Sequence, residues 1–161
     1  MKNQPLILVL YVDDMFLTGE EHLIAQCKRE LAIEFEMKDL GLLHYFLGLE
    51  VRQETCEIFL SQGKYVRDIL QKFGMLDCKP MATPMVTNLK KLHDAVTGSD
   101  LVDPTQFRQL IGSLLYLVHI KPDIYYAVSA LSQFMSSPKH IHWIVAKHVL
   151  QYLRGTQYCG L

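Results

Sequence analysis

The chain has 161 residues, of which 50% are hydrophobic, and its formal net charge is -1. This length and composition are those of about one globular domain with a buried core. The near-neutral charge argues against autonomous nucleic-acid binding, because domains with that function are usually basic. No apolar run approaches the ~20 residues that a membrane span requires, and no signal peptide is recognisable. The cysteines lack metal-ligand spacing and are interpreted as reduced thiols of an intracellular protein; they are Cys27, Cys56, Cys78 and Cys159.

The first predicted element is a hairpin that carries two adjacent acids. Residues 6–10 form an apolar incoming strand, Tyr11-Val12-Asp13-Asp14 the turn, and residues 15–18 the outgoing strand. A carboxylate leaves water only when it is paired or holds a metal, so we expect a tight turn that moves both acids into a cleft. Such a turn can hold Mg²⁺, which takes one or two carboxylates plus substrate phosphates. Alternatively, Asp-Asp is an ordinary turn signal.

A helix is predicted next, over residues 20–35, with Thr18 and Glu21 as a capping box. Its predicted buried face consists of Leu23, Ile24, Cys27 and Leu31. A turn at Asp39-Leu40-Gly41 precedes a strand over residues 43–51, in which every second residue is apolar. After a turn near residues 54–56, a strand over 57–60 completes a second hairpin.

A second helix is predicted over residues 64–73, where the apolar residues have core spacing and Gly74 is the stop signal. Its predicted core residues are Tyr65, Val66, Ile69, Leu70 and Phe73. Lys64, Arg67 and Gln71 share the outer face. They either follow a phosphate backbone, which requires only charge and reach, or are simply solvated.

Residues 75–102 contain Pro80, Pro84 and Gly98 and few periodic apolar residues, which predicts a linker. Three antiparallel helices are expected beyond it, opening at Asp103-Pro104, Pro122 and Ser137-Pro138. Their predicted core residues are Phe107, Leu110, Ile111, Leu114, Leu115 and Val118, then Ile124, Ala127, Val128, Leu131 and Met135, then Trp143, Ala146, Val149, Leu150 and Leu153. No Cys or carboxylate is spaced to complete a metal site with the neighbouring His140, His142 and His148. The predicted fold class is α+β.

Short blocks along nearly the whole chain resemble, in order and spacing, the reverse transcriptases of copia-type retrotransposons. They lie at residues 10–15, 37–41, 44–50, 60–65, 77–80, 83–85, 107–117, 121–124 and 152–156. The block at 10–15 resembles the catalytic motif of the family. In Lys121-Pro122-Asp123-Ile124, the lysine stands where the family pattern has arginine.

The resemblance implies a partial palm with its following helix over residues 1–74, a linker over 75–102, and a helical bundle like the thumb or connection over 103–161. It implies RNA-directed DNA synthesis with Mg²⁺ or Mn²⁺, and Asp13 and Asp14 as catalytic metal ligands. The implied partners are an RNA or DNA template–primer and deoxynucleotides. The implied primer and template contacts are Tyr11, Val12, Phe46, Leu47, Gly48, Lys64 and Arg67. Gly48 is the most telling of these, since a glycine inside a strand often marks close approach of another backbone. The alternative is an ordinary hairpin that packs on a helix.

The family also carries a third aspartate in an upstream palm strand, and we find no counterpart of it in this sequence. Its fingers and ribonuclease H segments are likewise expected outside this chain, as parts of the same polyprotein. We therefore expect an internal piece of a polyprotein, located in the cytoplasm, a virus-like particle or the nucleus. We expect no polymerase activity from this chain alone, and whether it alone binds the metal stays open. An unpaired apolar edge on the first strand predicts poor solubility.

Two alternatives from other classes remain. One is a retained, non-catalytic protein that binds a partner through its helical half. The other is a module that grips nucleic acid but performs no chemistry.

Overall fold

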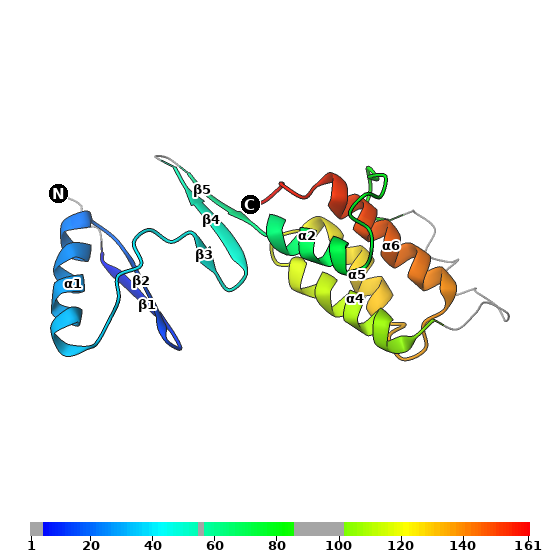
Figure 1. Cartoon of the computed structure of the whole chain (residues 1–161). Helices are drawn as coiled ribbons and strands as arrows, with labels where there is room; N and C mark the ends of the chain where they lie inside the picture. The colour runs from blue at the N-terminus through cyan, green and yellow to red at the C-terminus, as the bar shows by residue number, and fades with distance from the viewer. Residues whose placement is uncertain (1–4, 55–56, 86–101) are drawn as a thin grey trace. The chain divides into compact units, whose positions relative to one another are not determined.

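The computed structural model describes residues 5–54, 57–85 and 102–161. The chain divides into two compact units, Met1–Leu42 and Leu43–Leu161 (Figure 1). Both units contain helix and strand, so the prediction of an α+β fold is confirmed. The functional ranges 1–74, 75–102 and 103–161 stay a prediction.

The first unit begins with the predicted hairpin. Strands β1 (Ile7–Tyr11) and β2 (Asp14–Thr18) pair antiparallel, from Ile7 opposite Thr18 to Tyr11 opposite Asp14. The acidic motif therefore spans the end of β1, a two-residue connection and the start of β2. This arrangement confirms the predicted hairpin.

Helix α1 (Glu21–Glu34) follows the hairpin, within two residues of its predicted limits. The predicted capping box is wrong: Glu20 is the N-cap and makes no side-chain cap bond. Thr18 cannot cap the helix because it is held in β2 opposite Ile7. The predicted face is the less exposed side of α1, but no residue of the helix is buried.

The predicted turn after α1 is fixed by its aspartate. The Asp39 carboxylate accepts a hydrogen bond from the Gly41 amide at 2.9 Å and binds the Lys28 ammonium at 2.8 Å. The hydrogen bond with Lys28 is the largest cause that holds the pKa of Asp39 below its usual value. The two bonds tie the turn back to α1.

The second unit begins with a three-stranded antiparallel sheet in the order β3-β4-β5. Its strands are β3 (Tyr45–Phe46), β4 (Leu49–Gln53) and β5 (Ile58–Ser61). The single strand predicted over residues 43–51 is wrong, because the chain reverses at Leu47 and Gly48. Both residues have positive φ, 48° and 79°, as a two-residue hairpin turn of type I′ requires. The apolar alternation did not reveal the turn because it continues on either side of it.

The helices of the second unit are α2 (Gly63–Lys72), α4 (Pro104–Leu117), the short 3-10 helix η1 (Pro122–Ile124), α5 (Tyr125–Ser132) and α6 (His140–Gly155). The predicted C-terminal stop of α2 and the predicted N-terminal start of α4 are confirmed. Gly74 adopts φ 64° beyond α2, and the Met75 amide bonds the Leu70 carbonyl at 2.7 Å, as in a Schellman stop. Asp103 caps α4 by accepting from the Thr105 amide at 2.8 Å.

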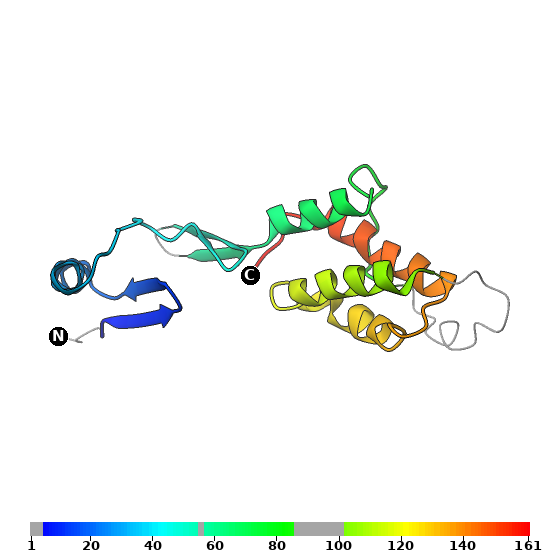
Figure 2. The same ribbon diagram turned by 60° about the horizontal axis from the view of Figure 1, so that its bottom comes forward.

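The hydrophobic core of this unit lies between α2, α4, α5 and α6 (Figure 2). The three helices expected beyond the linker are present as α4, α5 and α6, and α2 adds a fourth, since Val66, Ile69 and Leu70 belong to the same core. Within α4, Leu117 is buried whereas Leu115, predicted to point inward, is 41% exposed. The other core positions predicted in α2, α4, α5 and α6 are buried or half-buried.

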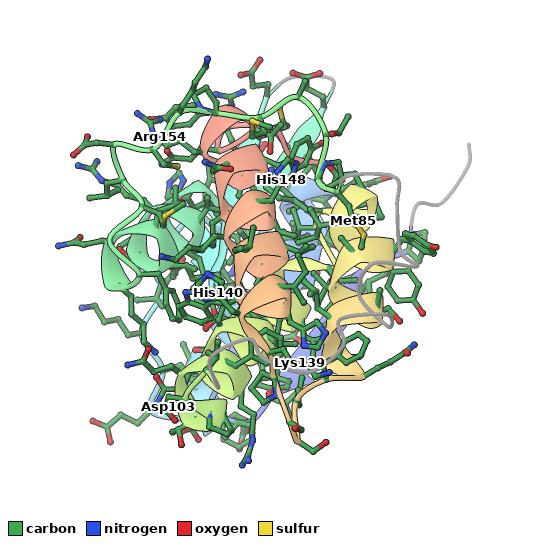
Figure 3. All side chains as sticks on the ribbon, turned by 90° about the vertical axis from the view of Figure 1, so that its right-hand side faces the viewer. Met85, Asp103, Lys139, His140, His148 and Arg154 are labelled. Carbon is green, nitrogen blue, oxygen red and sulfur yellow. The ribbon has the colours of Figure 1, made fainter. Side chains whose placement is uncertain are left out.

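The described part of the predicted linker, residues 75–85, runs along α6. The Leu76 carbonyl accepts a hydrogen bond from Arg154 Nε at 2.7 Å. The Met81 amide donates to the Gln151 carbonyl at 3.3 Å. His148 Nε2 lies 3.0 Å from the Thr83 carbonyl, and Figure 3 labels His148 and Arg154 on α6. Residues 86–101 lie outside the described part, and so does that half of the predicted linker.

The motif Lys121-Pro122-Asp123-Ile124 anchors the end of α6. Lys121 is 3% exposed, and its ammonium donates to the carbonyls of Thr156 at 2.6 Å and Cys159 at 2.9 Å. Burial of the ammonium lowers the pKa of Lys121. Asp123 accepts a hydrogen bond from the Tyr152 hydroxyl, and Ile124 is fully buried. The motif thus holds α6 by a cation, an acceptor and an apolar side chain.

No helix among the described residues is long and apolar enough to cross a membrane.

We predict that Lys121→Met lowers the free energy of unfolding of the chain by about 1–3 kcal/mol, because two backbone carbonyls lose their donor. Lys121→Arg retains a cation and should lose less. Urea denaturation measures both, with the exposed Lys79→Met as control. Equal urea midpoints for wild type and Lys121→Met would contradict the assignment.

A second prediction concerns alkaline pH. The hydrogen bond to Asp123 raises the pKa of Tyr152 to about 12, above its usual value of 10.0. The unfolded chain then releases this proton first, so the stability that the bond contributes is complete below about pH 10 and is lost toward pH 12. The stability difference between wild type and Tyr152→Phe should shrink from pH 9 to pH 11. Tyr158→Phe, at an 80% exposed position, should show no such trend.

Candidate active-site turn and nucleic-acid contacts

The turn between β1 and β2 consists of Val12 and Asp13, flanked by the paired Tyr11 and Asp14. Val12 has φ 51°, and a β-branched residue at positive φ is a genuine outlier. Its side chain is 78% exposed, so burial of the valine does not offset this strain. Strain of this kind is concentrated at functional sites, which makes the turn a candidate.

Asp13 and Asp14 are both exposed at this turn. Carboxylate oxygens are the hard ligands that Mg²⁺ and Mn²⁺ prefer, and Mg²⁺ commonly uses one or two of them together with substrate phosphates. The donor chemistry therefore fits a divalent metal. Within residues 5–54, 57–85 and 102–161, no group of three or more His, Cys, Asp or Glu side chains is placed to hold a metal ion. Asp13 and Asp14 would need further oxygen ligands from a substrate or another segment.

The second set of predicted contacts lies in the other unit, at the β3–β4 turn. Phe46 ends β3, and Leu47 and Gly48 form the turn. The Tyr116 hydroxyl of α4 donates a hydrogen bond to the Leu47 carbonyl and occupies the space where a Cβ on Gly48 would lie. Gly48 therefore marks a close approach, as predicted, but the approaching group is a side chain and not a backbone.

Lys64 lies beside this turn at the start of α2. Its amide donates to Glu50 Oε1 at 3.0 Å, and its ammonium lies 5.8 Å from the Tyr45 ring centroid. The structure thus groups Lys64 with the β3–β4 hairpin. Arg67 lies further along the exposed side of α2.

Sequence reasoning missed the contributions of Tyr45, Glu50 and Tyr116. The available signal for Tyr116 was its position off the apolar stripe of α4, beside buried Leu114 and Leu117. A tyrosine there is 38% exposed, and its hydroxyl is free to bond a neighbouring element. Nothing in the sequence identified that element as the β3–β4 turn.

Two histidines of α6 have structural roles. His142 is 1% exposed, its ring stacks on Phe134 at a centroid distance of 3.8 Å, and its Nδ1 accepts from the Lys139 amide at 3.0 Å. His148 contacts the Thr83 carbonyl. Figure 3 labels Lys139, His140 and His148 along this helix.

Several basic side chains of the helical half contact protein groups. Arg108 Nε donates to the Met135 carbonyl at 3.2 Å, and the Lys147 ammonium lies 5.6 Å from the Trp143 ring centroid. Lys121 and Arg154 also donate hydrogen bonds to backbone carbonyls of this unit. Cys27, Cys78 and Cys159 are free thiols, and burial raises the pKa of Cys78, which lowers its reactivity. Cys56 lies outside the described residues.

Comparison with known proteins identifies the class. The model of the reverse transcriptase (RNA-dependent DNA polymerase) family matches residues 1–87. The chain is 44% identical over 155 residues to an uncharacterized mitochondrial protein of Arabidopsis thaliana, covering 96% of this chain and 63% of that protein. No solved structure matches the chain.

Two further relatives are polyproteins. The retrovirus-related Pol polyprotein from transposon RE2 of Arabidopsis thaliana is 42% identical over 96% of this chain, which spans 10% of that polyprotein. The Pol polyprotein from transposon TNT 1-94 of Nicotiana tabacum is 39% identical, and the chain spans 12% of it. The chain belongs to the reverse transcriptase family. The predicted resemblance to copia-type retrotransposons is also confirmed.

We predict that Val12→Gly stabilises the β1–β2 hairpin. Glycine removes the cost of the left-handed conformation, and after its own entropic cost the net gain is about 0.5–1 kcal/mol. Amide hydrogen exchange in β1 and β2 should slow about two- to fivefold, whereas exchange in α4 stays constant. Faster exchange in the hairpin would show that Val12 is not strained.

Proposed function

We propose that this chain is the part of a retrotransposon reverse transcriptase that carries the metal-binding carboxylates Asp13 and Asp14. The observation that carries the proposal is an exposed, strained Val12-Asp13 turn inside the segment that matches the family. The proposed cofactor is Mg²⁺ or Mn²⁺. The proposed partners are the RNA or DNA template–primer, deoxynucleotides, and the other segments of the polyprotein.

In the proposed reaction, the 3′-hydroxyl of the primer attacks the α-phosphorus of a deoxynucleotide, and pyrophosphate leaves. Metal ions held by carboxylates would stabilise the attacking and leaving oxygens. Asp13 is the primary ligand in this proposal and Asp14 the second. Val12 would lie against the primer end, and Tyr11 would brace the turn.

The other proposed contacts lie in the second unit. Phe46, Leu47 and Gly48 would touch the primer strand, and Lys64 and Arg67 would contact its phosphates. The proposed palm covers residues 1–74, and the proposed thumb- or connection-like bundle covers 103–161. Helix α2, the last element of the proposed palm, contributes Val66, Ile69 and Leu70 to the core of that bundle.

We further propose that the chain alone does not extend a primer. The proposed metal clamp requires more ligands than two adjacent carboxylates supply. Partial metal binding at the turn remains measurable without catalysis.

The corresponding prediction is that Mn²⁺ broadens the amide resonances of residues 12–14 in wild type, because a paramagnetic ion bound there relaxes nearby nuclei. Asp13→Asn should abolish this broadening, whereas the exposed Asp68→Asn on α2 should not change it. A primer-extension assay with Mg²⁺ or Mn²⁺ completes the test. Primer extension by the wild-type chain that is lost in Asp13→Asn would contradict the proposal that the chain alone is inactive. If Mn²⁺ does not broaden these amide resonances in wild type, the proposed metal site at Asp13 and Asp14 is wrong.

A specific observation also favours nucleic-acid binding by the second unit without chemistry. Lys64, Tyr45 and Tyr116 place a cation and aromatic rings around one exposed turn. Grooves that bind single strands combine such groups, charge for the phosphates and rings for the bases. Because a lysine that neutralises a phosphate releases a counterion, such binding is expected to weaken as the salt concentration rises.

For this binding mode we predict that Lys64→Ala reduces the slope of log affinity against log salt by about 0.7–0.9, the loss of one phosphate contact. Fluorescence anisotropy with a labelled single strand and with a primer–template duplex measures the slope. Lys79→Ala serves as the matched control. An unchanged slope in Lys64→Ala would remove Lys64 from the interface.

A further inference from the structure

A tyrosine of the helical bundle contacts the β3–β4 turn directly. The Tyr116 hydroxyl donates to the Leu47 carbonyl, across 69 positions of sequence. The Tyr116 ring meets the Tyr65 ring of α2 edge-on, with centroids 4.7 Å apart and an interplanar angle of 70°. Tyr116 of α4 therefore contacts both the turn and a second helix.

The turn closes a short pair of strands. β3 contains two residues, Tyr45 and Phe46, which pair with Glu50 and Leu49 of β4. Leu47 adopts φ 48°, a conformation that costs an L-residue free energy. A hydrogen bond to the carbonyl of that same residue opposes a return to the more favourable backbone region.

The glycine in the turn fits the tyrosine. Gly48 has φ 79°, which favours glycine, and a Cβ at this position would overlap the Tyr116 hydroxyl. The two constraints are independent, because the first concerns the backbone and the second a neighbouring side chain. Removal of the hydroxyl relieves only the second.

We propose that Tyr116 is a positioning residue that fixes the Leu47–Gly48 turn on the α2–α4 face of the bundle. Its use in primer contact rests on the proposed function of the turn. Because Tyr116 contacts both the turn and α2, a shift of α4 relative to α2 would also move residues 47 and 48. The hydroxyl acts through the turn and touches no reacting atom.

The test compares Tyr116→Phe with Tyr126→Phe in the full chain. Tyr126 of α5 is 63% exposed and serves as the matched control. Loss of one hydrogen bond should speed amide exchange at residues 47–49 about three- to tenfold in Tyr116→Phe, with exchange in α4 and α6 unchanged. Unchanged exchange at residues 47–49 would overturn the proposal.

A double variant separates positioning from general packing. Gly48→Ala should lower the melting temperature more in the wild-type background than in Tyr116→Phe, because the phenylalanine lacks the hydroxyl that overlaps the added methyl group and its nearest ring carbon lies 3.3 Å away. Equal shifts in both backgrounds would overturn the proposed fit between Gly48 and the hydroxyl. If Tyr116 stabilised the fold only through packing of its ring, the effect of Gly48→Ala on the melting temperature would not depend on the Tyr116 hydroxyl.

Anisotropy with a DNA primer annealed to an RNA template gives the functional readout. Weaker binding by Tyr116→Phe, with Tyr126→Phe equal to wild type, supports the link to primer contact. Equal binding by Tyr116→Phe and wild type would overturn that link. If wild type itself does not bind, the proposed primer contact fails, whereas the exchange and melting results still decide whether Tyr116 positions the turn.

Discussion

The packing of the second unit depends on how the backbone carbonyls at the C-terminal end of α6 find hydrogen-bond donors. The last carbonyls of a helix have no partners within it and carry a partial negative charge. Lys121 supplies a buried cation to the Thr156 and Cys159 carbonyls from the connection between α4 and α5. Because the site is shielded from water, this charge acts more strongly than a surface lysine would.

Further contacts start from this anchored end. Asp123 bonds Tyr152, and Ile124 fills the core between the helices. Beyond α6, Gln157 Nε2 donates to the Gly63 carbonyl at 3.3 Å, and Leu161 exchanges two backbone hydrogen bonds with Leu60 of β5. The sheet and the bundle are thus joined through the same end of α6. A motif that resembles a family signature serves here as a structural joint.

Three chemically distinctive signals in the sequence predicted their structures correctly. Gly74 ends α2, Asp103 and Pro104 begin α4, and Tyr11-Val12-Asp13-Asp14 forms a hairpin turn. Each of these depends on residues close together in sequence, so local chemistry decides the outcome. Thr18 shows the limit, because pairing with Ile7 removed it from the helix that its local pattern favoured.

In the candidate site, too, the sequence predicts contacts between residues that are close in sequence but not contacts between distant ones. Asp13 and Asp14 could be named from the sequence because they are adjacent in it. The position of Tyr116 against Leu47 could not, because 69 positions separate the two residues and only the packed bundle brings them together. The reversal at Leu47 and Gly48 was hidden because a period of two fits one long strand and a hairpin equally well.

Within the described residues, Val12 and Leu47 are the non-glycine positions with positive φ, and both lie in two-residue hairpin turns. Strained residues persist where their surroundings determine the conformation more strongly than the local backbone does. For Leu47 that surrounding is the bundle, through Tyr116. For Val12 it is the pairing of β1 with β2, and a two-stranded hairpin by itself is marginal in water.

The apolar residues of β1 indicate what the rigidity of the Val12-Asp13 turn depends on. Ile7, Leu8, Val9 and Leu10 form a continuous apolar run, which is typical of a strand covered on both faces, yet each is 45–65% exposed in the first unit. Any surface that covers them contributes about 25 cal/mol for each Å² of apolar area removed from water. The geometry of the acidic turn is therefore encoded locally, whereas its rigidity depends on burial of β1. The Leu47–Gly48 turn already has its support from α4.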